Sequence, residues 1–346
     1  MSTTKLTIGL DLGDRRHSVC VLDILGEIIA EEVITNTAEC LERFSERYAG
    51  ATIIMETGTH SPWISRLFEG RGHRVIVANA RKVRAISQST TKNDQEDARM
   101  LARLGRVDPK LLSPVKHRSE EGQRALVKLK VREALVRSRV NQTNSARFLL
   151  KSLGIAVPSG WKAGSFTRKL REGLESGTRA LVEPLLGMID VLNTKIKVLD
   201  EELEAMANEQ YPATERLRQI PGVGPLTALC FVLTIESPER FQRARDVGPY
   251  LGLVPRQDQS GKSDKQLAIT KTGSSQLRRL LVNCAHYIMG PFGPPTHLRS
   301  VGMRLCERGG SSAKKRAVVA VARKLAVTLL ALWKSGADYQ PTPNAA

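Results

Sequence analysis

Apolar runs and amphipathic stretches alternate along the first hundred residues of this 346-residue chain. Short apolar or alternating runs predict strands at residues 7–11, 18–22, 27–34, 52–56 and 74–78. Stretches with apolar positions three and four apart predict helices at residues 38–48, 62–69 and about 93–105. The first two strands flank a turn at residues 13–16, and we expect the first three to be adjacent and antiparallel.

The order of these elements, β-β-β-α-β-α-β-α, predicts a ribonuclease H-like α/β domain at residues 1–112. Residues 113–212 predict a basic, coiled-coil-like region that starts with a long helix or helical hairpin at 116–153. A later run there is close to a heptad seam, which predicts packing in a helical hairpin or between subunits. We expect a mainly helical C-terminal domain at residues 213–335 and a disordered tail at 336–346.

Charge is unevenly distributed: the chain carries +18, residues 1–100 sum to −1 and the remainder to +19. This basic part favours a polyanionic partner, because neutralised phosphates release counterions. A membrane surface is the rival polyanion, but the sequence predicts no bilayer span and no secretion signal, so no membrane partner is expected. Five widely spaced cysteines without a C-x-x-C pair predict reduced core thiols of a cytoplasmic protein.

Four carboxylates stand at the ends of elements predicted in the first domain. Asp11 follows the apolar run TIGL, Glu56 ends TIIME, and Asp94 and Asp97 lie three residues apart on one helix face. Hard oxygen ligands suit Mg²⁺, with Mn²⁺ as an alternative, and two such ions can assist phosphodiester cleavage or joining. We predict a metal site made of these four residues. Alternatively, none of them binds a metal: Asp94 and Asp97 only stabilise a helix N-terminus, where the helix dipole favours acids, and Glu56 caps a loop.

The motifs around these carboxylates resemble those of the DEDD transposases of the insertion-sequence 110 family: GLDLG with Asp11, METG with Glu56, and KNDQEDARMLA with Asp94 and Asp97. The resemblance continues through IPGVGPLTA, YLGLVPRQDQSGKS and ITKTGSSQLRRLLV, whereas the middle helices match only in character. It implies a DNA transposase or recombinase with a Holliday-junction-resolvase-like metal site and a nucleophilic serine in the C-terminal domain. It also implies a structured guide RNA that pairs with donor and target DNA.

The resemblance points to Ser260 in the run QSGK as the nucleophile. Family members commonly carry Ser or Thr at the preceding position, where this chain has Gln259. A serine Oγ that attacks a phosphodiester retains the bond energy in a phosphoserine link, so rejoining needs no ATP. The alternative is a turn serine beside Gly261, and the fallback candidates are Ser263, Ser274 and Ser275.

Basic residues near this serine are predicted to contact phosphates, or else to be solvated surface charges: Lys262, Lys271, Arg278 and Arg279. The run PGVG at residues 221–224 resembles the turn of a helix-hairpin-helix element, whose backbone N–H groups approach a phosphate. A plain turn between packed helices is the other interpretation. Aromatic residues make up only 4% of the chain, so base-stacking platforms are not expected. Recognition of the DNA sequence is therefore assigned to the guide RNA.

Three other functions stay open at this point. GLDLGDRR also resembles the first phosphate loop of actin-like and sugar-kinase ATPases, an interpretation that needs a second D-x-G loop and an adenosine site as well. A metal-dependent junction-resolving nuclease would use water as the nucleophile, and a nucleic-acid-binding protein would lack catalysis. We expect donor and target DNA and a guide RNA as partners, a homodimer or homotetramer, and a cytoplasmic, nucleoid-associated location.

Overall fold

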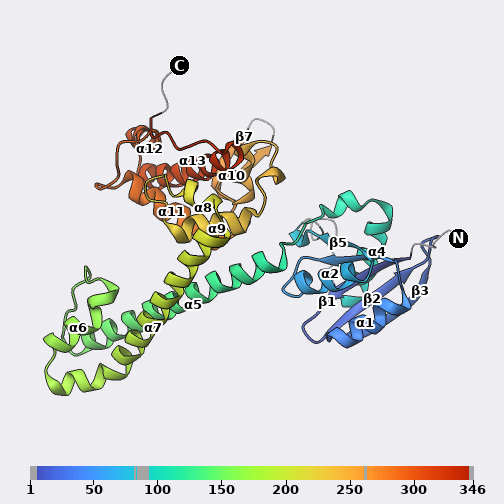
Figure 1. Ribbon diagram of the computed structural model, residues 1–346, viewed down its shortest axis with the longest axis horizontal. Helices are drawn as coiled ribbons and strands as arrows, with labels where there is room; N and C mark the ends of the chain where they lie inside the picture. The colour runs from blue at the N-terminus through green and yellow to red at the C-terminus, as the bar shows by residue number, and fades with distance from the viewer. Residues whose placement is uncertain (1–5, 82, 84–92, 261–262, 343–346) are drawn as a thin grey trace. The chain divides into compact units, whose positions relative to one another are not determined.

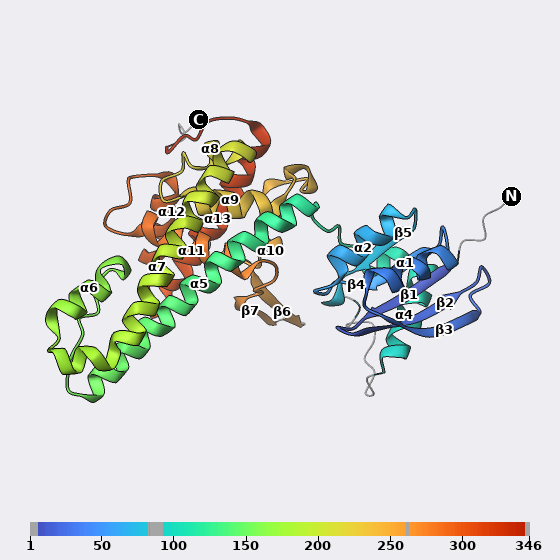
Figure 2. The same ribbon diagram turned by 60° about the horizontal axis from the view of Figure 1, so that its bottom comes forward.

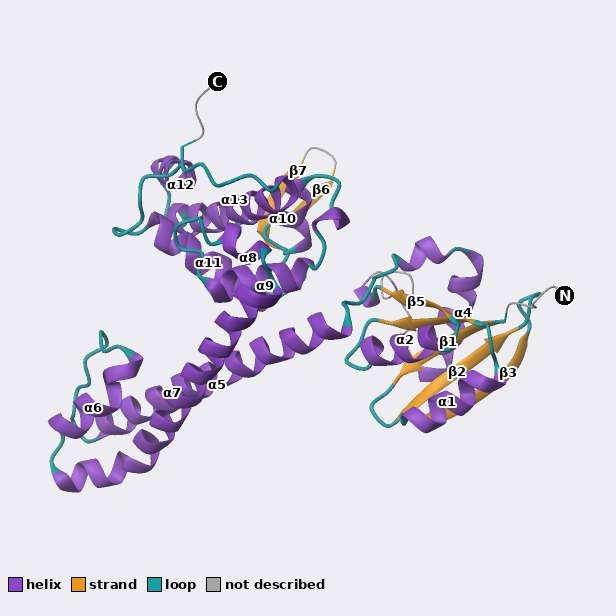
Figure 3. Ribbon diagram, viewed as in Figure 1, coloured by secondary structure: helices purple, strands orange, loops and turns teal. Residues whose placement is uncertain are grey.

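The computed structural model describes residues 6–81, 83, 93–260 and 263–342 (Figure 1). The chain forms two compact units, Met1–Ser119 and Glu120–Ala346. The first unit is mixed α/β and the second is mostly helical (Figure 3), which confirms the predicted fold class at this level. The division into three domains at residues 112/113 and 212/213 stays a prediction.

A five-stranded mixed sheet in the order β3-β2-β1-β4-β5 is the centre of the first unit. β1 (Thr7–Leu12), β2 (Arg16–Leu22) and β3 (Ile28–Thr35) are adjacent and antiparallel, as predicted. β4 (Thr52–Glu56) and β5 (Arg74–Ala78) extend the sheet in parallel on the other side of β1. This order is consistent with a ribonuclease H-like domain.

Helices cover both faces of the sheet. α1 (Ala38–Arg47) and α2 (Ser61–Gly70) cover one face, where their apolar residues pack against Ile8 and Leu10 of β1. α4 (Asp94–Val107) covers the other face, and the short helix η1 (Pro109–Leu112) follows it. All eight elements predicted in this unit are present, and each predicted end is within two residues of the observed one.

Gly9 allows α4 to approach the sheet closely. A Cβ at Gly9 would lie 1.9 Å from the carbonyl oxygen of Ala98 and 2.6 Å from the backbone nitrogen of Ala102. We expect Gly9→Ala to lower the free energy of unfolding by at least about 2 kcal/mol, because helix backbone cannot move aside as a flexible side chain can. Gly70→Ala is the control, since nothing lies within 4 Å of a Cβ there. Equal stability of both variants in urea unfolding would contradict this close approach.

A long helical hairpin starts the second unit. α5 (Glu120–Ser152) is one continuous helix, α6 (Ala163–Gly173) follows the turn, and α7 (Ser176–Gln210) returns antiparallel along α5 (Figure 2). Arg132 of α5 pairs with Asp200 of α7 at 2.6 Å, and Arg139 donates to Asn193 at 3.0 Å. The heptad-like run therefore packs in a hairpin, one of its two predicted arrangements.

A helical bundle around α9 (Pro225–Ile235) completes the second unit. α9 is buried almost throughout and packs in one core with α11 (Ser275–Met289) and α13 (Ala313–Ser335). The rings of Phe231 on α9 and Trp333 on α13 lie 6.4 Å apart. The shorter helices of the bundle are α8 (Ala213–Leu217), η2 (Pro238–Arg240), η3 (Ala244–Asp246), α10 (Val247–Tyr250) and α12 (His297–Glu307).

Two features of the C-terminal part differ from the predictions. β6 (Pro255–Ser260) and β7 (Ser263–Ile269) form an antiparallel hairpin in a region predicted to be mainly helical. Its sequence has no alternating apolar face, so the period-two signal of a strand is missing. The tail expected to be disordered makes hydrogen bonds to the bundle as far as Pro341. The Tyr339 N–H donates to Gln219 at 2.7 Å, and the Pro341 carbonyl accepts from the His297 N–H at 2.8 Å.

The five cysteines are not joined in disulfides among the described residues. Cys20, Cys230 and Cys284 are buried, whereas Cys40 and Cys306 are half-buried, so the core location is right for three of the five. Within the described ranges, no helix combines the length and the apolar character that a bilayer span requires.

Candidate active site and nucleic-acid interface

Asp11 and Glu56 lie at the carboxyl ends of two neighbouring parallel strands. Leu10 of β1 is in register with Met55 of β4, so the next residue of each strand, Asp11 and Glu56, occupies the same edge of the sheet. Gly9 contacts α4 and Ile54 packs with Leu101 of α4. Because strand side chains alternate between faces, Asp11 and Glu56 belong to the face that α4 covers.

The first turn of α4 contacts β2, the other neighbour of β1. Asn93 caps the helix by accepting from the Gln95 N–H at 3.0 Å, and the Gln95 side chain donates to the Val19 carbonyl at 3.0 Å. Val19 pairs with Leu10, the neighbour of Asp11. Asp94 is exposed and Asp97 half-buried on this turn. Asp11 and Glu56 thus end neighbouring strands on the face that α4 covers, and α4 begins with the turn that carries Asp94 and Asp97.

At the level of side chains, the four carboxylates do not form a closed metal cage. No group of three or more His, Cys, Asp or Glu residues in the described part of the chain is arranged to hold a metal ion. The donor chemistry nevertheless fits a hard divalent cation, since all four ligands are carboxylates.

Three other acids near these carboxylates have different surroundings. The Asp14 side chain is 96% exposed and lies 3.2 Å from His60. Asp23 accepts three backbone N–H groups in the turn after β2, and Glu96 pairs with Arg99. Asp23 therefore has a structural role that the sequence pattern does not indicate.

A contact that no local sequence pattern predicts fixes the start of α4. Arg99 binds Glu31 of β3 through two nitrogens, one of them at 2.6 Å, and Gln95 also donates to Glu31 at 3.1 Å. The hydrogen bonds from Arg99 lower the pKa of the Glu31 carboxyl. These residues lie more than sixty positions apart in the chain, so no local pattern identifies the contact. It holds the turn that carries Asp94 and Asp97 over the sheet.

Ser260 is the last residue of β6, and its backbone pairs with Ser263 at the start of β7. The Ser260 side chain and the whole of Lys262 lie outside the described residues. The base of this hairpin is fixed by close backbone packing. Gly252 has a φ of +66°, and a Cβ there would lie 2.2 Å from the Thr272 nitrogen. Only glycine fits this approach.

The other predicted phosphate contacts have different surroundings. Lys271 is exposed at a left-handed φ of +54°. Arg278 is half-buried and donates to the backbone carbonyls of Leu251 and Thr272, the first at 3.0 Å. Arg279 is exposed and pairs with Glu133 of α5. Arg278 therefore joins α11 to the base of the hairpin, and phosphate binding by these three residues stays a prediction.

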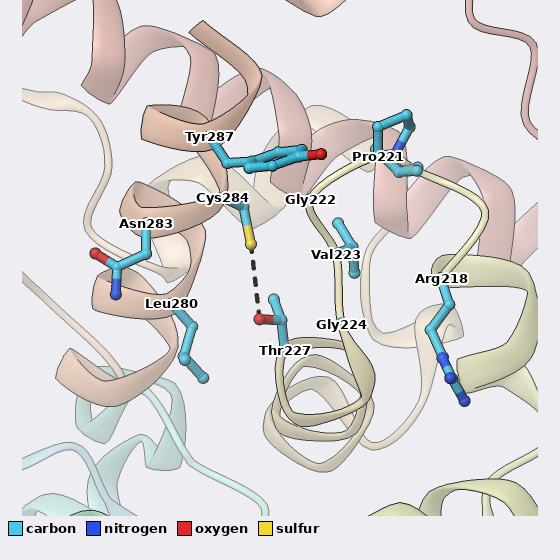
Figure 4. A pocket seen from close by; sticks show the side chains of 11 residues that line it. Arg218, Pro221, Gly222, Val223, Gly224, Thr227, Leu280, Asn283, Cys284 and Tyr287 are labelled. Atoms are coloured by element: carbon cyan, nitrogen blue, oxygen red, sulfur yellow. Dashed lines mark hydrogen bonds between the residues drawn. The ribbon is translucent and has the colours of Figure 1, made fainter. Parts of the chain in front are cut away.

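The PGVG turn borders an open hollow of about 520 Å³ (Figure 4). Gly222 has a φ of +88°, and a Cβ there would lie 2.7 Å from the Tyr287 ring. The Cys284 thiol and the Thr227 hydroxyl both line the hollow, and the thiol donates to the hydroxyl oxygen at 3.6 Å (Figure 4). α9 starts at this turn, and its N-cap residue Gly224 makes no side-chain capping hydrogen bond. The turn therefore presents backbone and a helix N-terminus to the hollow.

Two family models match the chain. A DEDD transposase model matches residues 8–155, and the transposase IS116/IS110/IS902 family model matches residues 214–298. The transposase for insertion sequence element IS1111A of Coxiella burnetii is 29% identical over 341 residues, covering 96% of this chain and 91% of the relative. That for element IS1328 of Yersinia enterocolitica is 28% identical over 289 residues, with coverages of 82% and 83%. A pilin gene-inverting protein of Moraxella bovis is 28% identical over 282 residues, with coverages of 79% and 76%.

The chain belongs to the IS110 family of transposases. The resemblance predicted from its motifs is confirmed, and the protein is a DNA-recombining enzyme of the insertion-sequence type. This assignment removes the ATPase and the non-catalytic alternatives. In the transposase, all four carboxylates lie within the first matched segment, whereas Ser260 and the PGVG turn lie within the second. The family description also supports dependence on a divalent metal.

Proposed function

We propose that this transposase cleaves and rejoins DNA strands by combining a divalent-metal site at Asp11, Glu56, Asp94 and Asp97 with a serine nucleophile at Ser260. The observation that supports the proposal is that Asp11 and Glu56 end neighbouring parallel strands on the face of the sheet that α4 covers. A ribonuclease H-like fold of residues 1–112 belongs to the same proposal.

The carboxylates would hold Mg²⁺, or Mn²⁺, through hard oxygen ligands. Such an ion, when bound, offsets the negative charge of a phosphodiester and polarises it toward attack. The remaining work falls to the protein's own residues. Glu31, Arg99 and Gln95 hold the first turn of α4 against the sheet, and Gly9 lets the helix lie close to β1.

The proposed step at Ser260 conserves the number of phosphodiester bonds. The Oγ attacks the phosphorus and loses its proton, while one strand end leaves as an alkoxide and takes up a proton. A phosphoserine diester replaces the cleaved linkage. Attack by the hydroxyl of another strand then restores a DNA linkage and frees the serine. The alternative is a junction-resolving nuclease in which water attacks and no protein-linked product forms.

Donor DNA, target DNA and a structured guide RNA are the proposed partners. The net charge of +19 on the residues after 100 supports binding to polyanions. The exposed backbone of the PGVG turn and the uncapped start of α9 support a helix-hairpin-helix-like contact to a phosphate. We also propose a homodimer or homotetramer, because two DNA partners must be held during exchange, and light scattering of the loaded complex measures its mass.

Strand transfer by the full chain tests the proposal. The transposase, with any RNA that copurifies, is mixed with DNA carrying its element's ends and with target DNA, in Mg²⁺, Mn²⁺ or EDTA. We expect joined strands and a denaturation-resistant protein–DNA adduct with either metal and neither product in EDTA. Cut strands without an adduct would favour the water nucleophile, and transfer in EDTA would contradict the metal site. Prior RNase treatment should abolish transfer, and full activity after it would refute the guide RNA.

A further inference from the structure

A second hollow, of about 390 Å³, lies near the closed end of the α5–α7 hairpin. Arg139, Thr143, Asn144 and Arg147 line it from α5, and Ser159 and Trp161 line it from the segment that leads into α6. Arg139, Thr143 and Arg147 are spaced by four residues and so project from one face of the helix. None of these residues has a role in the proposed strand transfer.

The two guanidinium groups in this hollow keep unused N–H donors. One nitrogen of Arg139 donates to Asn193 at 3.0 Å, and one nitrogen of Arg147 donates to the carbonyls of Val157 and Pro158 at 3.1 and 2.8 Å. Neither arginine forms an ion pair with a residue in the described ranges. A guanidinium has five N–H donors and stays charged, so both retain donors for an anion.

Trp161 adds a partly exposed aromatic surface to the same hollow. Its ring is fixed by Phe166, which lies edge-on at 6.3 Å, and by the Lys169 ammonium at 5.4 Å. Arg147 lies 5.1 Å from the Phe166 ring and so connects the aromatic pair to the charged side. The indole is therefore held in place before any ligand binds, which reduces the entropy lost on binding.

We propose that this hollow binds one unstacked nucleotide of a single-stranded nucleic acid. The base would stack on Trp161 and its phosphate would bind Arg139 and Arg147, while Thr143, Asn144 and Ser159 provide hydrogen-bonding groups for the base edge or sugar. A paired base in a duplex cannot reach an aromatic ring in this way. The hollow is thus a local exception to the expectation that a chain with few aromatic residues lacks stacking platforms.

Binding of short oligonucleotides to the full chain without metal tests the inference separately from catalysis. Fluorescence anisotropy is measured for oligouridylate, oligothymidylate and a DNA duplex of equal length. We expect Trp161→Ala to weaken single-strand binding about five-fold or more, because stacking on one aromatic ring contributes at least that factor. Duplex binding and Trp161→Phe should stay near wild type. If Trp161→Ala loses affinity for oligouridylate alone, the site binds RNA; if it loses affinity for oligothymidylate alone, the site binds DNA. If it loses affinity for both, the site accepts single-stranded RNA and DNA.

Arg139→Gln and Arg137→Gln provide a matched pair on α5, since Arg137 is exposed and does not line the hollow. Arg139→Gln should weaken single-strand binding more than Arg137→Gln and reduce the salt slope by about one. Unchanged affinity in Trp161→Ala, an equal loss in Trp161→Phe, an equal loss for the duplex, or equal effects of the two arginine changes would overturn the proposal. The arginine pair also decides the matter if Trp161→Ala unfolds.

Discussion

Asp11→Asn is expected to lower the rate of strand cleavage at least about 10³-fold while leaving DNA affinity nearly unchanged. Asparagine keeps the shape of the side chain but removes the charge that would hold the metal. The ion supplies several kcal/mol of transition-state stabilisation, and each 1.36 kcal/mol is a factor of ten in rate. DNA affinity should be equal or slightly higher, because a negative charge is removed. Single-turnover cleavage and fluorescence anisotropy measure the two quantities.

Asp14→Asn is the matched control for this experiment. It makes the same chemical change three residues later, at a side chain that is 96% exposed. We expect its cleavage rate to stay within about three-fold of wild type, since surface substitutions of this kind have small effects. Normal cleavage by Asp11→Asn would rule out the proposed metal site. An equal loss in both variants would instead indicate a general effect of charge at this edge of the sheet.

Ser260→Ala is expected to abolish the covalent protein–DNA adduct and the joined product. Removing the Oγ removes the only atom of this side chain that can bond to phosphorus. DNA and RNA binding should persist, because the substitution leaves the charge of the protein unchanged. Gel analysis under denaturing conditions detects the adduct, and anisotropy measures binding. Cleavage without an adduct in this variant would show that water can replace the serine at the metal site.

Ser263→Ala is the control for Ser260→Ala, because the two residues pair across the β6–β7 hairpin. An adduct that persists in Ser260→Ala but disappears in Ser263→Ala would move the nucleophile to Ser263. Ser274 is a weaker replacement, since its side chain caps α11 by accepting from the Leu277 N–H at 3.2 Å. Adduct formation in both variants would exclude the hairpin serines.

The sequence by itself determined the elements of the first unit and the family of the chain. The alternation of Ile8 and Leu10 with Gly9 and Asp11 in β1 is a local signal, because each strand residue reports which face it occupies. The carboxylates could be named for the same reason, since each stands at the end of an element. The motifs around them and beyond residue 213 were sufficient for the family, which the comparisons confirmed.

Only the tertiary structure decided how those elements hold one another. The contact of Arg99 and Gln95 with Glu31, the clamp of Arg278 on the Leu251 carbonyl, and the contact of the tail with Gln219 join residues far apart in the chain. The β6–β7 hairpin has no apolar face to predict it, and its strands are paired through backbone hydrogen bonds. Local periodicity reports which face of an element is buried, whereas pairwise contacts depend on which elements the fold brings together.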